Sequence, residues 1–342
     1  MRAAVISAPG ELEVATVDDP APGLREVVVD VAACGICGTD LHILEGEFAP
    51  SLPVVPGHEF AGEVVAVGSG VTEVLVGDQV AVDPSLHCGE CRYCRRGRGN
   101  LCERWAAIGV TTAGGAADYA VVPVANCFVL PEGCDPADAA LIEPLACAVR
   151  GFDVLQHALA DHYLVYGAGT MGLMMAQLAQ RAGAATVSVV DINPSRLVAA
   201  RELSLSYAVT AADELERERG WDIVIDCSGA VAAIEDGLGR VAPGGTFLQF
   251  GVSAEQATAR ISPYRIYNSE ITITGSMAVL HSFERAGELF VGGALRPDVL
   301  ISDRVPLTDY AEAITRFQSG DSRKIQVQPR LSRNSGEHPW TS

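Results

Sequence analysis

One lysine, Lys324, occurs among the 24 basic residues of the chain, and the others are arginines. A phosphate-binding loop of the Walker-A type needs a lysine after its glycines, and this chain has none in such a place. A pyridoxal phosphate enzyme needs a lysine for its Schiff base, and only Lys324, near the end of the chain, is available. The shortage excludes the first class of protein and argues against the second.

Positive charge is scarce as well, because the formal net charge is −19 at pH 7. A protein that binds nucleic acid needs a positive surface for the phosphates, so we expect no nucleic-acid partner. The one basic cluster consists of Arg92, Arg95, Arg96 and Arg98, which lie between cysteines. We interpret these arginines as the solvated rim of a metal-binding loop.

Long apolar runs are missing, although 49% of the residues are hydrophobic. A membrane-spanning helix needs about 18 or more consecutive apolar residues, and no such run occurs. The first residues reach Pro9 too soon to form the apolar core of a signal peptide. Ten cysteines without an export signal indicate metal ligands or buried thiols rather than disulfides. We therefore expect a cytoplasmic protein that binds no membrane.

With 342 residues, the chain exceeds the usual size of one domain. Residues 1–150 contain short branched runs between glycines and prolines, which predicts a β-rich domain. From 151 to 275 strands and helices alternate, with strands expected at 163–166, 187–190, 207–209, 222–226, 246–250 and 271–274. This alternation predicts an α/β fold with a doubly wound parallel sheet. We expect residues 276–331 to return to the first domain and 332–342 to form a disordered tail.

A glycine-rich turn joins the first of these strands to a helix. Gly167 permits a tight turn, Gly169 lets the backbone approach a pyrophosphate, and Gly172 allows the helix to pack closely on the strand. Thr170 and Met171 begin the helix, whose free amides would hold the phosphates. The pattern predicts a dinucleotide site, against the plainer interpretation of an ordinary glycine turn.

Two residues further along bear on the choice of cofactor. Asp191 ends the next strand, where a carboxylate accepts hydrogen bonds from the adenosine ribose and repels a 2′-phosphate. Arg196 is close enough in sequence to contact such a phosphate. Because the carboxylate would occupy the place of that phosphate, we expect NAD rather than NADP.

Four cysteines gather in one short segment, namely Cys88, Cys91, Cys94 and Cys102. Four thiolates complete the tetrahedral shell of a zinc ion and leave no position open for a substrate. An iron–sulfur cluster uses similar ligands, but one structural zinc fits the rest of the sequence better. Four unrelated thiols in so short a segment is the weaker interpretation.

A second candidate metal site is dispersed along the chain and comprises Cys37, His58, Glu59 and Glu143. Each alone has a plain interpretation, as a buried thiol, a core histidine or a helix-capping carboxylate. Together with a dinucleotide site they make chemical sense, because an alcohol loses a hydride more easily as an alkoxide. Zinc lowers the pKa of bound water from about 16 to about 7, and a bound alcohol should respond similarly. The set therefore predicts a catalytic zinc.

Charge suggests different roles for the two glutamates. One thiolate, one carboxylate and a neutral imidazole offset the two charges of zinc, whereas a second carboxylate would make the site anionic and a poorer Lewis acid. We therefore expect Cys37, His58 and Glu59 to bind the metal. Glu143 would orient the metal-bound water or exchange with it.

Two more side chains follow Cys37 at the expected start of a helix. Thr39 can take the proton of the alcohol, and His42 can pass that proton toward solvent through the ribose hydroxyls. The plainer interpretation of His42 is a surface histidine.

The segments around these residues resemble the zinc-containing medium-chain alcohol dehydrogenases. The resemblance lies in residues 35–42 and 57–64, the four-cysteine loop and the glycine-rich turn, and it covers about residues 1–330. It implies a GroES-like catalytic domain and a Rossmann domain. It further implies two zinc ions per chain, one catalytic and one structural, and a homo-oligomer that is a dimer or a tetramer.

Within that family, residues 143–146, Glu-Pro-Leu-Ala, resemble the branch that acts on polyols such as sorbitol, xylitol and arabitol. Simple alcohol dehydrogenases usually carry a cysteine where Glu143 falls, and threonine dehydrogenases usually show an Asp-Pro-Phe-Gly-like segment. Aminocyclitol dehydrogenases share Glu-Pro-Leu, so L-threonine and aminocyclitols stay alternative substrates. We expect a secondary alcohol to be oxidised to a ketone, with reduction as the alternative direction. A non-catalytic NAD-binding sensor is the alternative from another class, and the complete ligand set argues against it.

Overall fold

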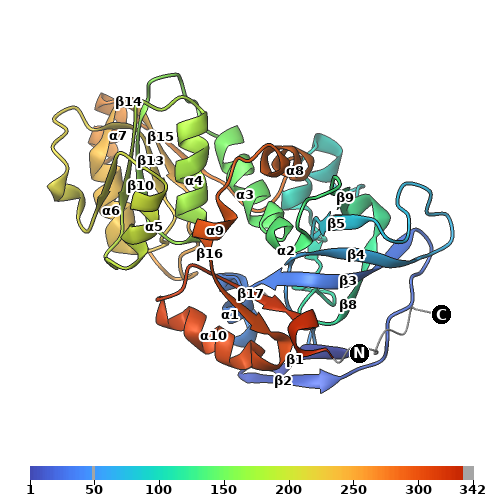
Figure 1. Ribbon diagram of the computed structural model, residues 1–342. Helices are drawn as coiled ribbons and strands as arrows, with labels where there is room; N and C mark the ends of the chain where they lie inside the picture. The colour runs from blue at the N-terminus through green and yellow to red at the C-terminus, as the bar shows by residue number, and fades with distance from the viewer. Residues whose placement is uncertain (48–50, 334–342) are drawn as a thin grey trace. The chain divides into compact units, whose positions relative to one another are not determined.

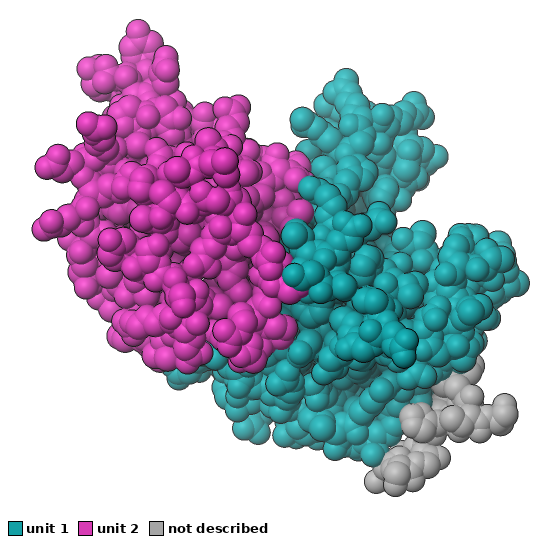
Figure 2. All heavy atoms as spheres, turned by 45° about the horizontal axis from the view of Figure 1, so that its top comes forward, with its two compact units in different colours: residues 1–146, 279–292, 301–342 teal, residues 147–278, 293–300 magenta. Residues whose placement is uncertain are grey.

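The computed structural model describes residues 1–47 and 51–333 of the chain. Contacts divide the chain into two compact units, which Figure 2 colours separately. Unit 1 comprises Met1–Ala146, Val279–Gly292 and Ile301–Ser342, and unit 2 comprises Cys147–Ala278 and Gly293–Leu300. From the sequence we placed domain boundaries after residues 150 and 275. Unit 2 begins at Cys147, and it also contains Gly293–Leu300, which the sequence had assigned to the segment that returns to the first domain. The expected disordered tail lies, from residue 334 onward, outside the described residues.

A seven-stranded sheet forms the centre of unit 1, in the order β16-β17-β3-β4-β5-β9, with β8 paired to β3. The strands are β3 (Glu26–Gly35), β4 (Glu59–Val67), β5 (Gln79–Val82), β8 (Tyr119–Pro123), β9 (Cys127–Val129), β16 (Ile301–Pro306) and β17 (Lys324–Gln328). β3 is buried along nearly its whole length, because its run of valines and alanines is covered on both faces. One face packs into a core that includes Val29, Phe60, Val80 and Val122.

Shorter elements surround this sheet (Figure 1). Two-stranded sheets are formed by β1 (Arg2–Ala8) with β2 (Glu11–Thr16) and by β6 (Ser85–Leu86) with β7 (Ala106–Ala107). The helices are α1 (Gly38–Leu44), α2 (Pro136–Ala139), α8 (Phe283–Val291) and α10 (Tyr310–Ser319), and α3 (Ile142–Asp153) continues into unit 2. A second core joins Tyr310 and Ile314 of α10 to Ile325 of β17 and Ile36.

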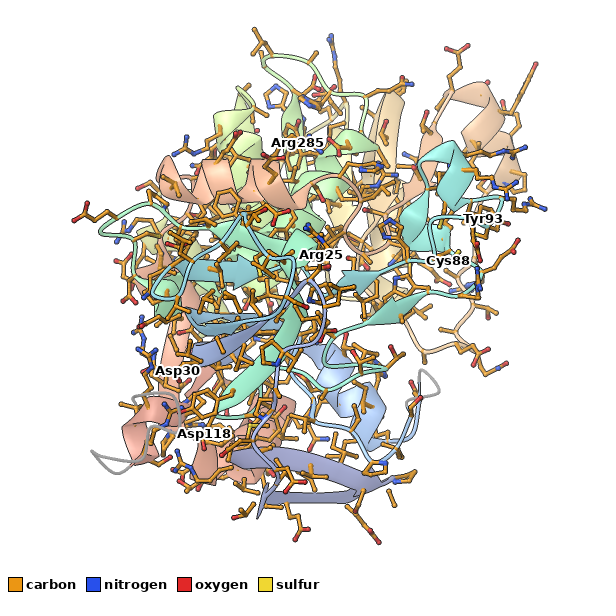
Figure 3. The ribbon with its side chains drawn as sticks, turned by 90° about the vertical axis from the view of Figure 1, so that its right-hand side faces the viewer. Arg25, Asp30, Cys88, Tyr93, Asp118 and Arg285 are labelled. Atoms are coloured by element: carbon orange, nitrogen blue, oxygen red, sulfur yellow. The ribbon has the colours of Figure 1, made fainter. Side chains whose placement is uncertain are left out.

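An ion cluster fastens the end of the described chain to the sheet of unit 1. Asp30 lies on β3 and Asp118 immediately precedes β8; Figure 3 labels both. The guanidinium of Arg333 lies 2.8 Å from Asp30 and 3.3 Å from Asp118, and that of Arg2 lies 2.8 Å from Asp118. Asp30, Asp118 and Arg333 are nearly buried, and buried charges persist in a fold only when they are paired. The cluster therefore holds both ends of the described chain against one sheet.

Unit 2 is built on a six-stranded parallel sheet in the order β12-β11-β10-β13-β14-β15. Its strands are β10 (His162–Tyr166), β11 (Thr186–Val190), β12 (Tyr207–Val209), β13 (Trp221–Asp226), β14 (Val241–Gln249) and β15 (Thr272–Gly275). Each of the six strands expected from the sequence is present, and β14 begins five residues earlier than expected because the extended chain continues through 241–245. The strand order reverses beside β10, the point at which doubly wound sheets bind nucleotides. The α/β fold with a parallel sheet is confirmed.

Helices cover both faces of this sheet (Figure 1). They are α4 (Thr170–Arg181), α5 (Arg196–Glu202), α6 (Val231–Arg240), α7 (Pro263–Asn268) and α9 (Pro297–Leu300). On one face Gly172 of α4 approaches Val165, and on the other Ile234 of α6 packs with Leu164 and Phe247. No helix in the described part of the chain combines the length and apolarity needed to span a bilayer.

Candidate active site

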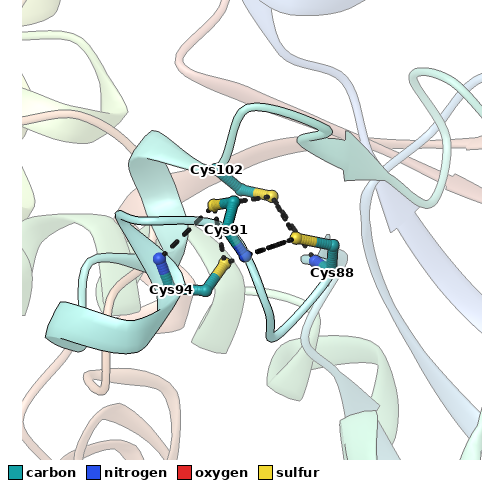
Figure 4. Close-up of side chains that lie close together, drawn as sticks. All are labelled: Cys88, Cys91, Cys94 and Cys102. Atoms are coloured by element: carbon teal, nitrogen blue, oxygen red, sulfur yellow. Dashed lines mark hydrogen bonds between the residues drawn. The ribbon is translucent and has the colours of Figure 1, made fainter.

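The four cysteines of residues 88–102 converge on one point in the lobe between β6 and β7 (Figure 4). The sulfur of Cys102 lies 3.5 Å from that of Cys88, and Cys94 lies 3.5 Å from Cys91. The pairs Cys88–Cys94 and Cys91–Cys102 are each 3.9 Å apart. Four thiolates at tetrahedral angles and 2.3 Å from one zinc would be about 3.8 Å apart. The spacing of the sulfurs therefore fits one zinc ion.

Backbone amides of the same loop point at these sulfurs. The amides of Cys91 and Cys94 donate to Cys88 and Cys91 at 3.3 and 3.5 Å, and that of Arg104 donates to Cys102 at 3.3 Å. Hydrogen bonds from backbone amides lower the pKa of the Cys88 thiol to about 6 and lower that of Cys91 as well, whereas burial and the neighbouring thiols raise the pKa of Cys94 to about 12. A loop that stabilises thiolates in this way is suited to a metal, because the thiolate is the form that binds it. Arg92, in the basic rim, stacks over Tyr93 at 4.7 Å from its ring centre.

The dispersed candidates meet at the neighbouring ends of β3 and β4. Cys37 stands at the N-terminal cap of α1, just after β3, and His58 and Glu59 stand at the start of β4, where Glu59 pairs with Gly35. One ligand atom from each of Cys37, His58 and Glu59 lies within 4.8 Å of the others. A β-carbon on Gly35 would come within 2.1 Å of the Glu59 carboxylate, so glycine leaves the room that this side chain needs.

The chemistry of this group suits a metal ion. The Nδ1 atom of His58 is buried, has no hydrogen-bond partner among the described residues and lies 3.9 Å from a carboxylate oxygen of Asp40. Burial disfavours the charged imidazole, but the hydrogen bond with Cys37 and the nearby negative charges outweigh it, so the pKa of His58 is raised. A thiol, an imidazole and a carboxylate are the donor types of catalytic zinc sites.

Glu143 begins α3 and is buried, outside the group of three but within its electrostatic reach. Burial raises the pKa of Glu143 to about 7, and the charge of Glu59 adds to the effect while that of His58 opposes it. A nearby positive charge would therefore favour loss of the proton from this carboxyl group. The ligand atoms that lie within 4.8 Å of one another come from Cys37, His58 and Glu59, without Glu143.

The two candidates for proton transfer lie on α1. The thiol of Cys37 is 3.8 Å from the hydroxyl of Thr39, so Thr39 lies beside the group of three. His42 is partly exposed, and its Nδ1 atom lies 2.7 Å from the carboxylate of Glu47. Contact with solvent suits a group that releases a proton. The sequence did not predict Glu47 as the partner of His42.

In unit 2 the glycine-rich turn has the conformation that its sequence predicts. Gly167 has φ of +98°, which favours glycine, and a β-carbon on Gly172 would come within 1.8 Å of the Gly167 carbonyl oxygen. Gly169 caps α4, with open space beside its α-carbon, and Thr170 and Met171 form the first helical residues. The turn therefore leaves helix amides accessible at the carboxyl edge of the sheet.

Asp191 follows β11 at the same edge and is buried. Its carboxylate accepts hydrogen bonds from the amides of Ala168, at 2.7 Å, and Asn193, at 2.8 Å. The guanidinium of Arg196 lies 3.8 Å from it. Asp191 thus ties the glycine-rich turn to the next strand, a contact that the sequence did not reveal, and keeps negative charge where an adenosine ribose would lie.

Comparison with known proteins agrees with this architecture. Residues 23–132 match the model of the alcohol dehydrogenase GroES-like domain, and residues 170–292 match the zinc-binding dehydrogenase model. The D-altritol 5-dehydrogenase of Agrobacterium fabrum is 38% identical, over 91% of this chain and 94% of its own. The chain belongs to the zinc-binding dehydrogenase family.

Other relatives of this dehydrogenase differ in substrate. The L-threonine 3-dehydrogenase of Saccharopolyspora erythraea is 37% identical over 95% of this chain and 98% of its own, and further relatives are named for D-arabinitol and sorbitol. A solved zinc-binding dehydrogenase from Sinorhizobium meliloti, bound to NADP, has a TM-score of 0.93 and 33% identity, over 96% of this chain and 99% of that one. The family identifies the chain as an alcohol oxidoreductase.

Lys324 is a further residue of this site in the dehydrogenase that the sequence did not single out. Its ammonium group, at the start of β17, donates to both carboxylate oxygens of Glu59, at 2.7 and 2.6 Å, and to the carbonyl of Ile36, at 2.9 Å. The exposed fractions of the two side chains are 4% and 2%. Burial lowers the pKa of a lysine, but the charge of Glu59 outweighs it, so the pKa of Lys324 is raised and the ammonium keeps its proton.

Lys324 changes the charge argument made from the sequence. That argument counted Cys37, Glu59 and a divalent ion, and it left Glu143 off the metal because a second carboxylate would make the site anionic. With the charge of Lys324 included, three negative groups balance zinc and lysine together. The charge argument was therefore incomplete, and it gives no reason to keep Glu143 away from the metal.

Proposed function

We propose that the protein is a zinc-dependent polyol dehydrogenase that oxidises a secondary hydroxyl of a sugar alcohol to a ketone and passes the hydride to NAD. The observation that carries the proposal is the group formed by the half-buried Cys37 and the buried His58 and Glu59 at the ends of β3 and β4. Such a donor set has little structural use without a metal. A sensor without catalytic function would have no need for it.

In this mechanism Cys37, His58 and one of Glu59 and Glu143 hold the metal. Zinc, when bound, supplies a Lewis acid that lowers the pKa of the substrate hydroxyl. Thr39 accepts the proton of that hydroxyl, and His42 passes it toward solvent through the ribose hydroxyls. Lys324 keeps its proton and neutralises Glu59.

A second zinc would be held by Cys88, Cys91, Cys94 and Cys102. Four thiolates leave no open position, so its role is to hold the lobe between β6 and β7 together. The cofactor would lie at the carboxyl edge of the sheet in unit 2, with its pyrophosphate at Gly167–Gly172 in the glycine-rich turn and its adenosine ribose at Asp191.

We propose NAD as the preferred cofactor, because a buried carboxylate at the end of β11 repels a 2′-phosphate. Arg196 is already paired with Asp191, so part of its charge is neutralised. Solved proteins of similar fold are bound to NADP in one case and to NADH in another, so the fold alone does not select the cofactor. The substrate proposal rests on Glu143 and on the relatives named for sugar alcohols, and L-threonine is the second candidate because of the 37% identity to a threonine dehydrogenase.

The first prediction concerns substrate and cofactor together. Zinc-loaded protein is mixed with NAD or NADP and with sugar alcohols, L-threonine, aminocyclitols and simple alcohols, and the absorbance of reduced cofactor is followed. We expect a sugar alcohol with NAD to give the highest kcat/KM. Turnover of L-threonine or of an aminocyclitol alone would be consistent with the proposed mechanism but would refute the proposal that the substrate is a sugar alcohol. No turnover with both zinc ions verified would refute the proposed function.

We further propose that the protein associates with a second copy of itself through β15. This strand is one of the two edges of its sheet in the described chain, the other being β12, and its backbone groups on one side have no strand partner there. Ile273, on β15, is 43% exposed, and Tyr267, on the adjacent α7, is 83% exposed. An apolar, uncharged edge of this kind is suited to pairing with an identical strand.

The test of this second prediction is the mass in solution. Analytical ultracentrifugation of the wild type should give a multiple of the chain mass, and Ile273→Lys should shift the population toward single chains, because a charge on an edge strand opposes pairing. Leu159→Lys, which places the same charge at another exposed apolar position of unit 2, is the control and should keep the wild-type mass. A single-chain wild type would refute the proposal.

A further inference from the structure

Asp226 ends β13 at the carboxyl edge of the sheet in unit 2, and none of its surface is exposed. Its Oδ1 atom accepts hydrogen bonds from the amide and the hydroxyl of Ser228, at 3.1 and 2.6 Å. Its Oδ2 atom accepts from the amide of Gly229, at 2.9 Å, and from the side chain of Gln249, at 2.8 Å. A buried carboxylate is costly unless it is satisfied in this way, so these four bonds shape the chain around it.

The bonds of Asp226 join two loops that follow neighbouring strands. Residues 227–229 follow β13, and residues 250–253 follow β14. The amides of Phe250 and Gly251 donate to the carbonyl of Asp226, and the hydroxyl of Ser253 donates to the carbonyl of Gly229 at 2.8 Å. The loops approach so closely that a β-carbon on Gly229 would come within 2.0 Å of the backbone of residue 252. Residues 227–229 and 250–253 therefore form one continuous surface, which we call the wall.

This wall stands directly beside the glycine-rich turn. The amide of Cys227 donates to the carbonyl of Tyr166 at 2.8 Å, and a β-carbon on Gly167 would lie 3.3 to 3.4 Å from the backbone of Cys227 and Ser228. The amides of Ser228 and Gly229 are turned inward to Asp226. No hydrogen bond within the described chain reaches the carbonyl oxygens of Cys227 and Ser228. Carbonyl acceptors at this edge are suited to hydroxyl donors of a ribose.

The strand order assigns the wall to one half of a dinucleotide. β10, β11 and β12 form one mononucleotide-binding half, which contains Asp191, and β13, β14 and β15 form the other. We propose that Asp226 is the positioning residue of the second half, and that it shapes the wall of residues 227–229 and 250–253 for the nicotinamide riboside of the cofactor. The proposal rests on the proposed function, because it assumes a nicotinamide dinucleotide.

The experiment compares NADH, which needs both halves, with AMP, which needs only the adenosine half. Dissociation constants are measured by calorimetry for the wild type and for Asp226→Asn. The amide of asparagine cannot accept the bonds that one carboxylate oxygen receives, so we expect binding of NADH to weaken about tenfold or more. Binding of AMP should change less than about twofold, because Asp191 and the glycine-rich turn are untouched.

The control is Asp222→Asn, the same substitution on the same strand, four residues before Asp226. Asp222 accepts a hydrogen bond from the amide of His162 and should leave both ligands near their wild-type affinities. If Asp226→Asn does not fold, Gln249→Leu removes one of the four bonds and should weaken NADH alone by a smaller factor. Equal weakening of NADH and AMP, or none, would overturn the inference while the proposed function stands. A wild type that binds neither ligand would overturn both.

Discussion

Replacing Lys324 by methionine is expected to lower the free energy of unfolding of unit 1 by about 3–5 kcal/mol. The substitution leaves the carboxylate of Glu59 buried, with no cation in the place where the ammonium now donates at 2.6 and 2.7 Å. A buried charge without a partner costs far more than an exposed one, because water cannot solvate it. Urea unfolding gives the free energy, and hydrogen exchange of β3 and β4 shows whether unit 1 is the part affected.

A double-mutant cycle separates the cost of the unpaired charge from the worth of the pair. Glu59→Gln with Lys324→Met removes both charges, and we expect this double variant to recover most of the lost stability. Lys324→Arg is the matched control, since it retains the charge. If Lys324→Met were as stable as the wild type, or if Glu59→Gln brought no recovery, the buried ion pair would not be the cause.

The cycle also bears on catalysis. If Lys324 sets the charge of the metal site, Lys324→Met should lose activity as well as stability, and the double variant should regain part of both, because removing one charge of each sign restores the balance. Recovery of stability without activity would mean that the carboxylate of Glu59 is itself needed at the metal. Measurements with and without zinc distinguish the two, because only the metal-loaded protein tests the balance of charge.

Local patterns were sufficient to predict much of this protein. The strands of unit 2 are predicted by their alternation with helices. Gly167, Gly169 and Gly172 indicate a dinucleotide site because a predicted strand precedes them and a predicted helix follows them. Cys88 and its three partners lie within one short loop, so that their meeting requires no knowledge of the fold. Cys37, His58 and Glu59 are farther apart, and what connected them was that an alcohol needs a Lewis acid to lose a hydride at a dinucleotide site; the resemblance to a family then supported the connection.

Contacts between distant strands could not be predicted in the same way. Lys324 reaches Glu59 across 265 residues only because β17 pairs with β3 and β3 with β4, and that register is not written in any local pattern. The charge argument for Glu143 was incomplete at this point, since it counted only residues already suspected of binding metal. Part of the role of Asp226 could have been predicted, because an acidic residue at the end of a strand, before Ser228 and Gly229, suggests a turn. Its link to Gln249, however, depends on the neighbouring strand.

Replacing Cys37 by alanine is expected to lower kcat by at least about a thousandfold. Lewis-acid activation of the alcohol contributes several kcal/mol to the barrier, and about 4 kcal/mol corresponds to that factor. The same variant should bind NADH within about twofold of the wild type, because the glycine-rich turn and Asp191 belong to unit 2. Elemental analysis should find one zinc per chain in place of two, since the four thiolates of the lobe are untouched.

Cys34→Ala is the matched control, because it removes a thiol three residues earlier, at the end of the same strand. Cys34 is buried in the core of unit 1 with Phe60 and Val29, and its thiol donates weakly to the carbonyl of Gly35, at 3.8 Å. We expect this variant to keep two zinc ions and most of its activity, at a modest cost in stability. Normal turnover in Cys37→Ala would refute the metal site outright. Loss of activity with both zinc ions retained would instead show that Cys37 contributes to catalysis without being needed to hold the metal, and would transfer the ligand role to His58, Glu59 and Glu143.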